Sequence, residues 1–212
     1  MEIIPSILTN DLREVKEKLA RAEGVVQRIQ IDVVDGQFAS NKTFDPDLLE
    51  NFETDLNLDF HLMTKEPTLW VEKVVRAQAE RVIGQIEKMT DQLEFVGKVQ
   101  ELGISVGLAV DLGTPISSLD PIILRDLDVV LLMSVPAGFG GQEFDPRVHD
   151  KIKELIKLRK KDNSPFKICV DGGITEEIIA SLAKEEVDEI IVGRLFHGDL
   201  AENLKRWKKK IS

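Results

Sequence analysis

Short apolar runs rich in β-branched residues alternate with charged, amphipathic segments along the whole 212-residue chain. Repetition of strand and helix favours parallel pairing of the strands through right-handed crossovers. The apolar runs predict strands at residues 3–8, 28–34, 58–63, 81–86, 105–110, 129–134, 167–170 and 189–192. The segments between them predict helices at residues 11–22, 46–52, 68–77, 91–102, 121–125, 147–160, 175–184 and 199–209.

Eight such units of roughly 26 residues each are the number and size expected of a small (β/α)8 barrel. An open, doubly wound sheet could be built from the same alternation, but the count and the regular spacing favour closure. No linker rich in Pro, Ser or Gly interrupts the pattern, so we expect a single α/β domain over residues 1–212. The longest connections, residues 35–45 and 135–145, both precede helices and therefore lie on the catalytic face of a barrel.

Composition excludes several classes of partner. A formal net charge of −10 argues against binding to nucleic acid or to an anionic membrane. The single cysteine, Cys169, excludes an intrachain disulfide and suits a reducing compartment. We find neither a signal peptide nor an apolar run of about 18 residues, so we expect a cytoplasmic protein. The basic cluster at residues 205–210 is interpreted as the end of a terminal helix.

Polar residues inside the apolar runs are the informative ones, because parallel strands in a barrel are normally apolar throughout. Gln30 and Asp32 lie two residues apart and point to one side of their strand, whereas Ile29, Ile31 and Val33 point to the other. If the apolar side packs against helices, Gln30 and Asp32 point into the barrel mouth.

Asp32, His61 and Asp171 stand at the ends of three different strands that open on this mouth. Taken singly, a strand-end Asp is more often a helix cap, and a lone His is more often a half-buried structural residue. Two carboxylates and one imidazole together can bind a divalent metal or act as acid and base. Ser6 interrupts the first strand, and Gln85 ends the fourth.

Glycine turns follow the last strands of the pattern. Glycine lets the backbone approach an anion closely, and phosphate sites in barrels commonly use the loops after strands seven and eight. Arg194 can add a charge-assisted contact to the same phosphate, unless it is a solvated surface residue. The residues assigned to this turn cluster are Gly138, Phe139, Gly140, Gly141, Gly172, Gly173 and Gly193.

Seven segments in order resemble the ribulose-phosphate 3-epimerase family. They are Ile4-Pro5-Ser6-Ile7-Leu8, Ile31-Asp32-Val33-Val34-Asp35-Gly36-Gln37-Phe38, Asn41-Lys42-Thr43-Phe44, Phe60-His61-Leu62-Met63, Leu131-Leu132-Met133-Ser134-Val135, Gly138-Phe139-Gly140-Gly141-Gln142 and Val170-Asp171-Gly172-Gly173. The resemblance implies a metal-assisted isomerase of the pentose phosphate pathway that inverts carbon 3 between D-ribulose 5-phosphate and D-xylulose 5-phosphate. It also implies a phosphorylated ketose as substrate and a homo-oligomer.

The resemblance also implies roles for single residues. Asp32 and Asp171 match the acid/base carboxylates, and together with His61 they match three of the four ligands of a divalent Zn, Fe, Mn or Co ion. Gln30 occupies the position of the fourth ligand. The residues expected to contact substrate are Ser6, His61, Met63, Met133, the turn glycines with Phe139, and Arg194.

Five changes, at six positions, depart from the family pattern. Gln30 and Gln85 stand where relatives have histidines, and Val34 stands where they have a methionine. Pro136-Ala137 replaces Asn-Pro, and Arg194 replaces a small hydroxyl residue. An amide oxygen is a weaker ligand than imidazole for zinc or iron, so we expect lower metal affinity. Three alternatives are a phosphosugar-binding barrel without turnover, a related epimerase with an altered ketose phosphate substrate, and a decarboxylase or aldol-type lyase. The last usually requires a lysine at a strand end.

Overall fold

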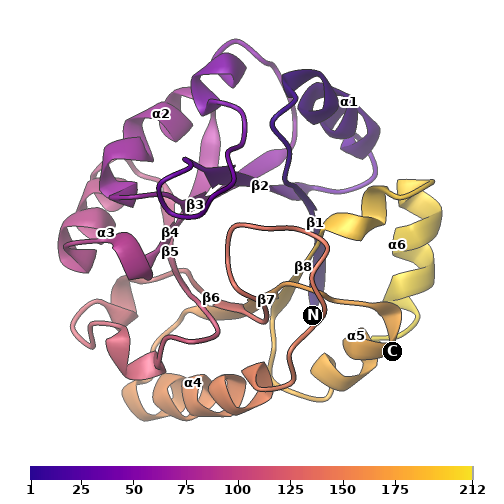
Figure 1. Cartoon of the computed structure of the whole chain (residues 1–212). Helices are drawn as coiled ribbons and strands as arrows, with labels where there is room; N and C mark the ends of the chain where they lie inside the picture. Colours follow the sequence, from indigo (N-terminus) through magenta and orange to yellow (C-terminus); the bar gives the residue numbers. More distant parts are fainter. Residues whose placement is uncertain (212) are drawn as a thin grey trace.

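The computed structural model describes residues 1–211, apart from the side chain of Asp162, and here eight parallel strands close into a barrel (Figure 1). Each strand pairs with the next, and the first pairs with the last, which confirms the predicted (β/α)8 barrel. The strands are β1 (Glu2–Ile7), β2 (Arg28–Val34), β3 (Asn57–Met63), β4 (Ala79–Gln85), β5 (Ser105–Val110), β6 (Val129–Met133), β7 (Lys167–Asp171) and β8 (Glu189–Val192).

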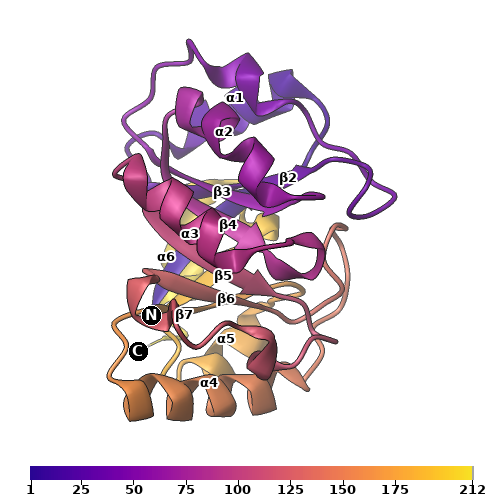
Figure 2. The same cartoon turned by 90° about the vertical axis from the view of Figure 1, so that its left-hand side faces the viewer.

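The helices surround the barrel on its outside, as Figures 1 and 2 show from two directions. They are α1 (Leu12–Ala22), α2 (Val71–Arg76), α3 (Gln92–Glu101), α4 (Val148–Asp162), α5 (Glu176–Leu182) and α6 (Leu200–Lys208). Short 3₁₀ turns complete the connections: η1 (Pro46–Leu49), η2 (Pro67–Trp70), η3 (Ile86–Lys88), η4 (Ile116–Ser118), η5 (Leu124–Asp126) and η6 (Gly193–Phe196).

Two helix predictions were wrong. Residues 46–52 form only the 3₁₀ turn η1, and residues 121–125 contribute only to the turn η5. Both segments are short, and a helix of one or two turns recovers few hydrogen bonds for the cost of nucleation. The helix predicted at residues 68–77 begins as η2 and continues as α2.

The two faces of β2 divide as their sequence predicts. Ile29, Ile31 and Val33 are buried in the apolar layer between the strands and the helices. Gln30 and Asp32 lie on the opposite face and are also buried. A second apolar cluster shares this inner face and fills the barrel beneath the site. It contains Ile4, Val34, Met63, Ile83, Ala109, Val129, Leu131, Met133, Cys169 and Ile191.

Ion pairs occupy the N-terminal end of the barrel interior. Arg81 Nε donates to Asp59 Oδ2 at 3.0 Å, and Arg81 Nη2 lies 2.8 Å from Glu189 Oε2. Arg28 also pairs with Asp59. The carboxylates of Asp59 and Glu189 and the guanidinium of Arg81 are all buried. Each of these charged groups is paired with an opposite charge in a region that excludes water. This end of the barrel is therefore packed, and the cavity lies at the other end.

Side-chain caps fix several helix starts that place the loops of the catalytic face. Asp11 Oδ1 accepts from Arg13 N at 2.8 Å at the start of α1, and Asp91 Oδ1 accepts from Glu94 N at 3.0 Å at α3. The basic residues near the C-terminus follow buried Leu204 in α6, as predicted. None of the helices within residues 1–211 has the length and apolar character that crossing a membrane requires.

Candidate active site

A cavity of about 410 Å³ opens at the C-terminal ends of the strands. Most of the predicted site residues line it: Ser6, Asp32, Met63, Met133, Gly138, Phe139, Gly140, Gly141, Asp171, Gly172, Gly173, Gly193 and Arg194. Gln30 and His61 are fully buried and do not line the cavity. The sequence predicted that both open on the barrel mouth and that His61 contacts the substrate, whereas the structure places them behind the residues that line the cavity.

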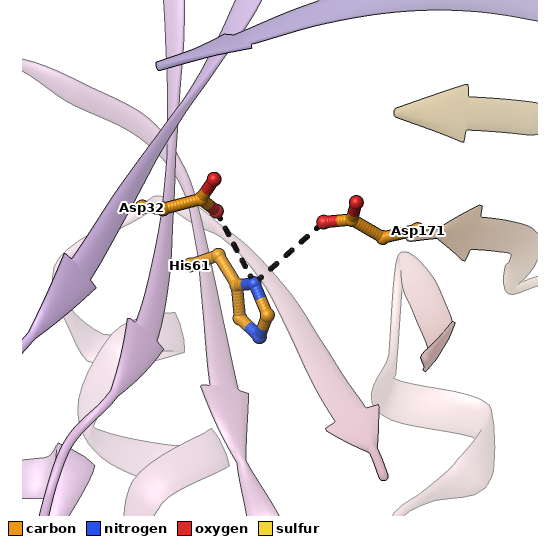
Figure 3. A group of neighbouring side chains, drawn as sticks. All are labelled: Asp32, His61 and Asp171. Atoms are coloured by element: carbon orange, nitrogen blue, oxygen red, sulfur yellow. Dashed lines mark ion pairs between the residues drawn. The ribbon is translucent and has the colours of Figure 1, made fainter. Parts of the chain in front are cut away.

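Three strands bring Asp32, His61 and Asp171 together (Figure 3). Asp32 of β2 is paired in register with His61 of β3, and Asp171 ends β7 on the far side of the barrel. His61 Nδ1 lies 3.4 Å from Asp32 Oδ1 and 4.0 Å from Asp171 Oδ2. One ligand atom of each residue lies within 4.8 Å of the others, which is a spacing that a single cation can bridge.

Gln30 joins the two carboxylates. Its Nε2 donates to Asp32 Oδ1 at 2.8 Å and to Asp171 Oδ2 at 2.9 Å. Gln30 Oε1 and His61 Nδ1 are buried without a hydrogen-bond partner among the described residues. A half-turn of the amide would exchange Oε1 and Nε2. Two carboxylates, a buried imidazole nitrogen and a buried amide oxygen form a donor set that fits a divalent cation.

The proximity of the two carboxylates changes their protonation. Burial and the nearby Asp32 carboxylate raise the pKa of Asp171 to about 7. Burial opposes a charged His61 imidazole, but the adjacent Asp32 and Asp171 carboxylates outweigh burial and raise its pKa. Asp171 is thus protonated in a substantial fraction of molecules at neutral pH, which is the condition that a general acid requires.

The turn after β7 shapes the other half of the cavity. Ser134 Oγ donates to Asp171 O at 2.9 Å and to Gly172 O at 2.5 Å, which fixes the end of β7. Gly173 has φ +58°, and a Cβ there would stand 2.2 Å from Phe144 N. Only glycine fits at this position, because the Phe144 backbone occupies the space that a Cβ would need.

The loops after β2 and β6 meet at the rim of the cavity. Asn41 Nδ2 donates to Gly138 O at 2.8 Å, and a Cβ on Gly138 would stand 2.5 Å from Ala39 Cβ. Gln142 Nε2 donates to Pro136 O at 2.8 Å and braces the same loop from within. The glycine turn after β6, residues 138–141, is thus held at the rim of the cavity by contacts from the β2 loop and from within its own loop.

A model of the family described as "Ribulose-phosphate 3 epimerase family" matches residues 2–197. This chain belongs to the ribulose-phosphate 3-epimerase family. It is 32% identical to the ribulose-phosphate 3-epimerase of Bacillus subtilis over 93% of each chain. It is 34% identical to that of Chlamydia muridarum, over 96% of this chain and 91% of the relative.

Solved structures outside the epimerase family share the fold. The 3-hexulose-6-phosphate synthase of Salmonella typhimurium superposes with a TM-score of 0.65 at 16% identity, over 100% of this chain and 98% of the other. The phosphoribosyl anthranilate isomerase of Thermus thermophilus gives 0.66 at 16% identity, over the same shares of the two chains. At this identity the likeness shows a common barrel and nothing about activity.

Two nitrogen-bearing side chains of this epimerase-family cavity were missed from the sequence. Lys18 of α1 and His197, which follows η6, both line it beside Arg194. Lys18 Nζ lies 2.6 Å from Glu14 Oε1 and 5.5 Å from the Phe196 ring centre. His197 could have been found, because it lies in the same βα loop as Arg194. Lys18 carries no such signal, since its helix pattern is that of an ordinary surface lysine.

Proposed function

We propose that this chain interconverts D-ribulose 5-phosphate and D-xylulose 5-phosphate by proton transfer at carbon 3. The observation that carries the proposal is the placement of Asp32 and Asp171, which approach one cavity from β2 and β7. Inversion requires a group on each face of the sugar, because the proton leaves one face and returns to the other. Two carboxylates from opposite walls of a barrel meet this requirement.

The two carboxylates act in opposite senses within one turnover. The ionised carboxylate removes the C3 proton, and the electrons of that bond form the C2–C3 double bond of an enediolate. The other carboxyl group, in its protonated form, returns a proton to C3 on the opposite face. In one direction Asp32 is the base and Asp171 is the donor. The reverse reaction exchanges the two roles.

Asp32, His61, Asp171 and Gln30 would hold the divalent metal. When bound, the cation supplies Lewis-acid stabilisation of the negative charge on the substrate oxygens. Gln30 would offer its amide oxygen, Oε1, to the metal. Three oxygens and one nitrogen suit a harder ion, so we place Mn²⁺ ahead of Zn²⁺, Fe²⁺ or Co²⁺ for this chain.

The remaining predicted residues bind and orient the sugar phosphate. Gly172, Gly173 and Gly193 line the cavity with Arg194, so their backbone N–H groups and its guanidinium would bind the phosphate. Ser6, Met63 and Met133 line the same cavity and would contact the sugar. By likeness to the family, residues 1–212 act as one domain in a cytoplasmic homo-oligomer, with no nucleic-acid or membrane partner.

The test is conversion of ribulose 5-phosphate, followed by NMR, with protein reconstituted separately with Mn²⁺, Fe²⁺, Co²⁺ and Zn²⁺. Asp32→Asn and Asp171→Asn should each lower kcat by about 10²–10⁴-fold, the usual contribution of an acid or base. The contacts of Gln30 with both carboxylates favour one alternative, a phosphosugar-binding barrel without turnover. Tight binding of ribulose 5-phosphate with no conversion under any metal would establish that alternative and overturn the proposal.

A further inference from the structure

A chain of hydrogen bonds, buried at its start and half-buried at its end, continues from His61. His61 Nε2 lies 2.7 Å from Gln85 Oε1, and Gln85 Nε2 donates to Glu87 Oε2 at 2.7 Å. The other oxygen of this carboxylate, Glu87 Oε1, accepts from Asp111 N at 2.7 Å. Gln85 ends β4, Glu87 lies in η3, and Asp111 follows β5. The hydrogen bonds thus link His61 of β3 to the connection after β4 and to the residue after β5.

The chemistry of the chain gives it a direction. Both oxygens of Glu87 accept hydrogen bonds, Oε1 from Asp111 N and Oε2 from Gln85 Nε2, so the amide nitrogen of Gln85 faces Glu87. Gln85 therefore presents Oε1, an acceptor, to His61. A neutral imidazole carries one N–H, and an acceptor at Nε2 places that hydrogen on Nε2. His61 Nδ1 is left with a lone pair that faces Asp32 and Asp171.

Because His61 and Gln85 are buried, Gln85 decides which nitrogen of His61 carries the hydrogen. Gln85 and His61 are both fully buried, so water does not compete as a partner for either group. Without the acceptor, the favoured position for the hydrogen would be Nδ1, because Asp32 Oδ1 lies 3.4 Å away and accepts hydrogen bonds. A hydrogen at Nδ1 would block the nitrogen that faces the other ligand atoms.

We propose that Gln85, oriented by Glu87, is a positioning residue that holds the Nε2 hydrogen of His61 and so reserves Nδ1 for the metal. The metal itself rests on the proposed function. The tautomer of His61 does not, because it follows from hydrogen bonds within the protein alone. Groups that orient a ligating histidine typically change metal affinity by about 10–100-fold when they are removed.

The first test reads the tautomer directly. The chain has three histidines, so ¹⁵N-labelled histidine gives few signals, which single His-to-Gln variants assign. At a pH where the imidazole is neutral, the metal-free protein should show His61 protonated at Nε2 and unprotonated at Nδ1. Gln85→Leu should shift the hydrogen toward Nδ1. Protonation at Nδ1 in the unaltered protein, or an unchanged tautomer in Gln85→Leu, would overturn the proposal.

The second test measures binding of Mn²⁺ and Zn²⁺ by calorimetry without substrate. Gln85→Leu should weaken binding by about 10–100-fold. Gln85→His supplies one donor for Glu87 and one acceptor for His61 Nε2, so it should retain both the tautomer and most of the affinity. If Gln85→Leu does not fold, Glu87→Gln tests the same point, because an amide at residue 87 no longer forces one orientation on Gln85. Equal loss in the Leu and His variants would indicate a merely structural role and contradict the proposal.

Neither measurement uses a sugar phosphate. Failure to epimerise ribulose 5-phosphate would leave both readouts unchanged, so it would count against the proposed reaction alone. A wrong tautomer in a protein that does epimerise would count against the role of Gln85 alone.

Discussion

The fourth metal-ligand position is the sharpest test of the site, and Gln30→His is the substitution that probes it. In the metal-free protein Gln30 Nε2 donates to both carboxylates, at 2.8 and 2.9 Å. A cation between Asp32 and Asp171 competes with these hydrogen bonds. The amide must turn before Oε1 can act as a ligand, and at least one of the two bonds is lost.

The magnitude follows from these contacts. A hydrogen bond to a charged group contributes about 1.5–3 kcal/mol, and each 1.4 kcal/mol is a factor of ten in affinity. Losing one such bond therefore weakens metal binding by about 10–100-fold. An imidazole at residue 30 supplies a better nitrogen ligand for Zn²⁺, so the gain from Gln30→His should be larger for Zn²⁺ than for Mn²⁺.

The assay is calorimetric titration of the metal-free protein with each ion. Gln100→His is a matched control, because it makes the same substitution at an exposed amide on α3 and should leave both affinities unchanged. Gln30→His should tighten Zn²⁺ binding by about 10–100-fold relative to the unaltered protein. Unchanged or weaker binding of Zn²⁺ in Gln30→His would refute the reasoning, since it would show that residue 30 does not contact the metal.

Three further predictions follow from single contacts. Burial and Asp32 raise the pKa of Asp171 from the ordinary 3.8 to about 7, so its ionised form is less stable in the folded chain than in the unfolded one. This penalty is absent below pH 4, develops as the pH rises, and is complete above pH 7, where it is worth up to about 4 kcal/mol. Asp171→Asn should therefore stabilise the metal-free protein at pH 8 and have little effect below pH 4 in denaturant unfolding; an equal effect at both values would contradict this. Gly173→Ala should lower the stability of the fold more than Gly24→Ala does. Both glycines have positive φ, but a Cβ at Gly24 has no atom within 4 Å, whereas a Cβ at Gly173 would stand 2.2 Å from backbone. Similar melting temperatures for the two variants would count against this prediction. Arg194→Ala should raise KM for the sugar phosphate by about 10–100-fold with little change in kcat, because it removes one charge-assisted contact to the phosphate. An unchanged KM would show that Arg194 does not contact the phosphate.

The barrel could be predicted because its pattern is local and repeated. On β2 the alternation of Ile29 and Ile31 with Gln30 and Asp32 fixes which face meets the helices, and the structure keeps that division. The short turns η1 and η5 were mistaken for helices, because composition alone does not show how many turns a segment completes.

The site was predictable where its residues end strands and less so where it depends on closure of the barrel. Asp32 and Asp171 could be placed in one mouth from the strand count. The contact of Gln30 Nε2 with Asp171 could not, because β2 and β7 are far apart in the chain and meet only across the closed barrel. The link from Gln85 to Glu87 likewise depends on side-chain rotamers that the sequence pattern does not specify.

Exchange of solvent hydrogen at carbon 3 tests the central claim most directly, because it reports proton transfer by the carboxylate pair even when net conversion is small. Metal-loaded protein in D₂O should incorporate deuterium at C3 of ribulose 5-phosphate, and Asp32→Asn and Asp171→Asn should each lower kcat for epimerisation by about 10²–10⁴-fold. The contradicting result is a folded, metal-loaded protein that leaves the C3 proton in place with Mn²⁺, Fe²⁺, Co²⁺ and Zn²⁺ alike.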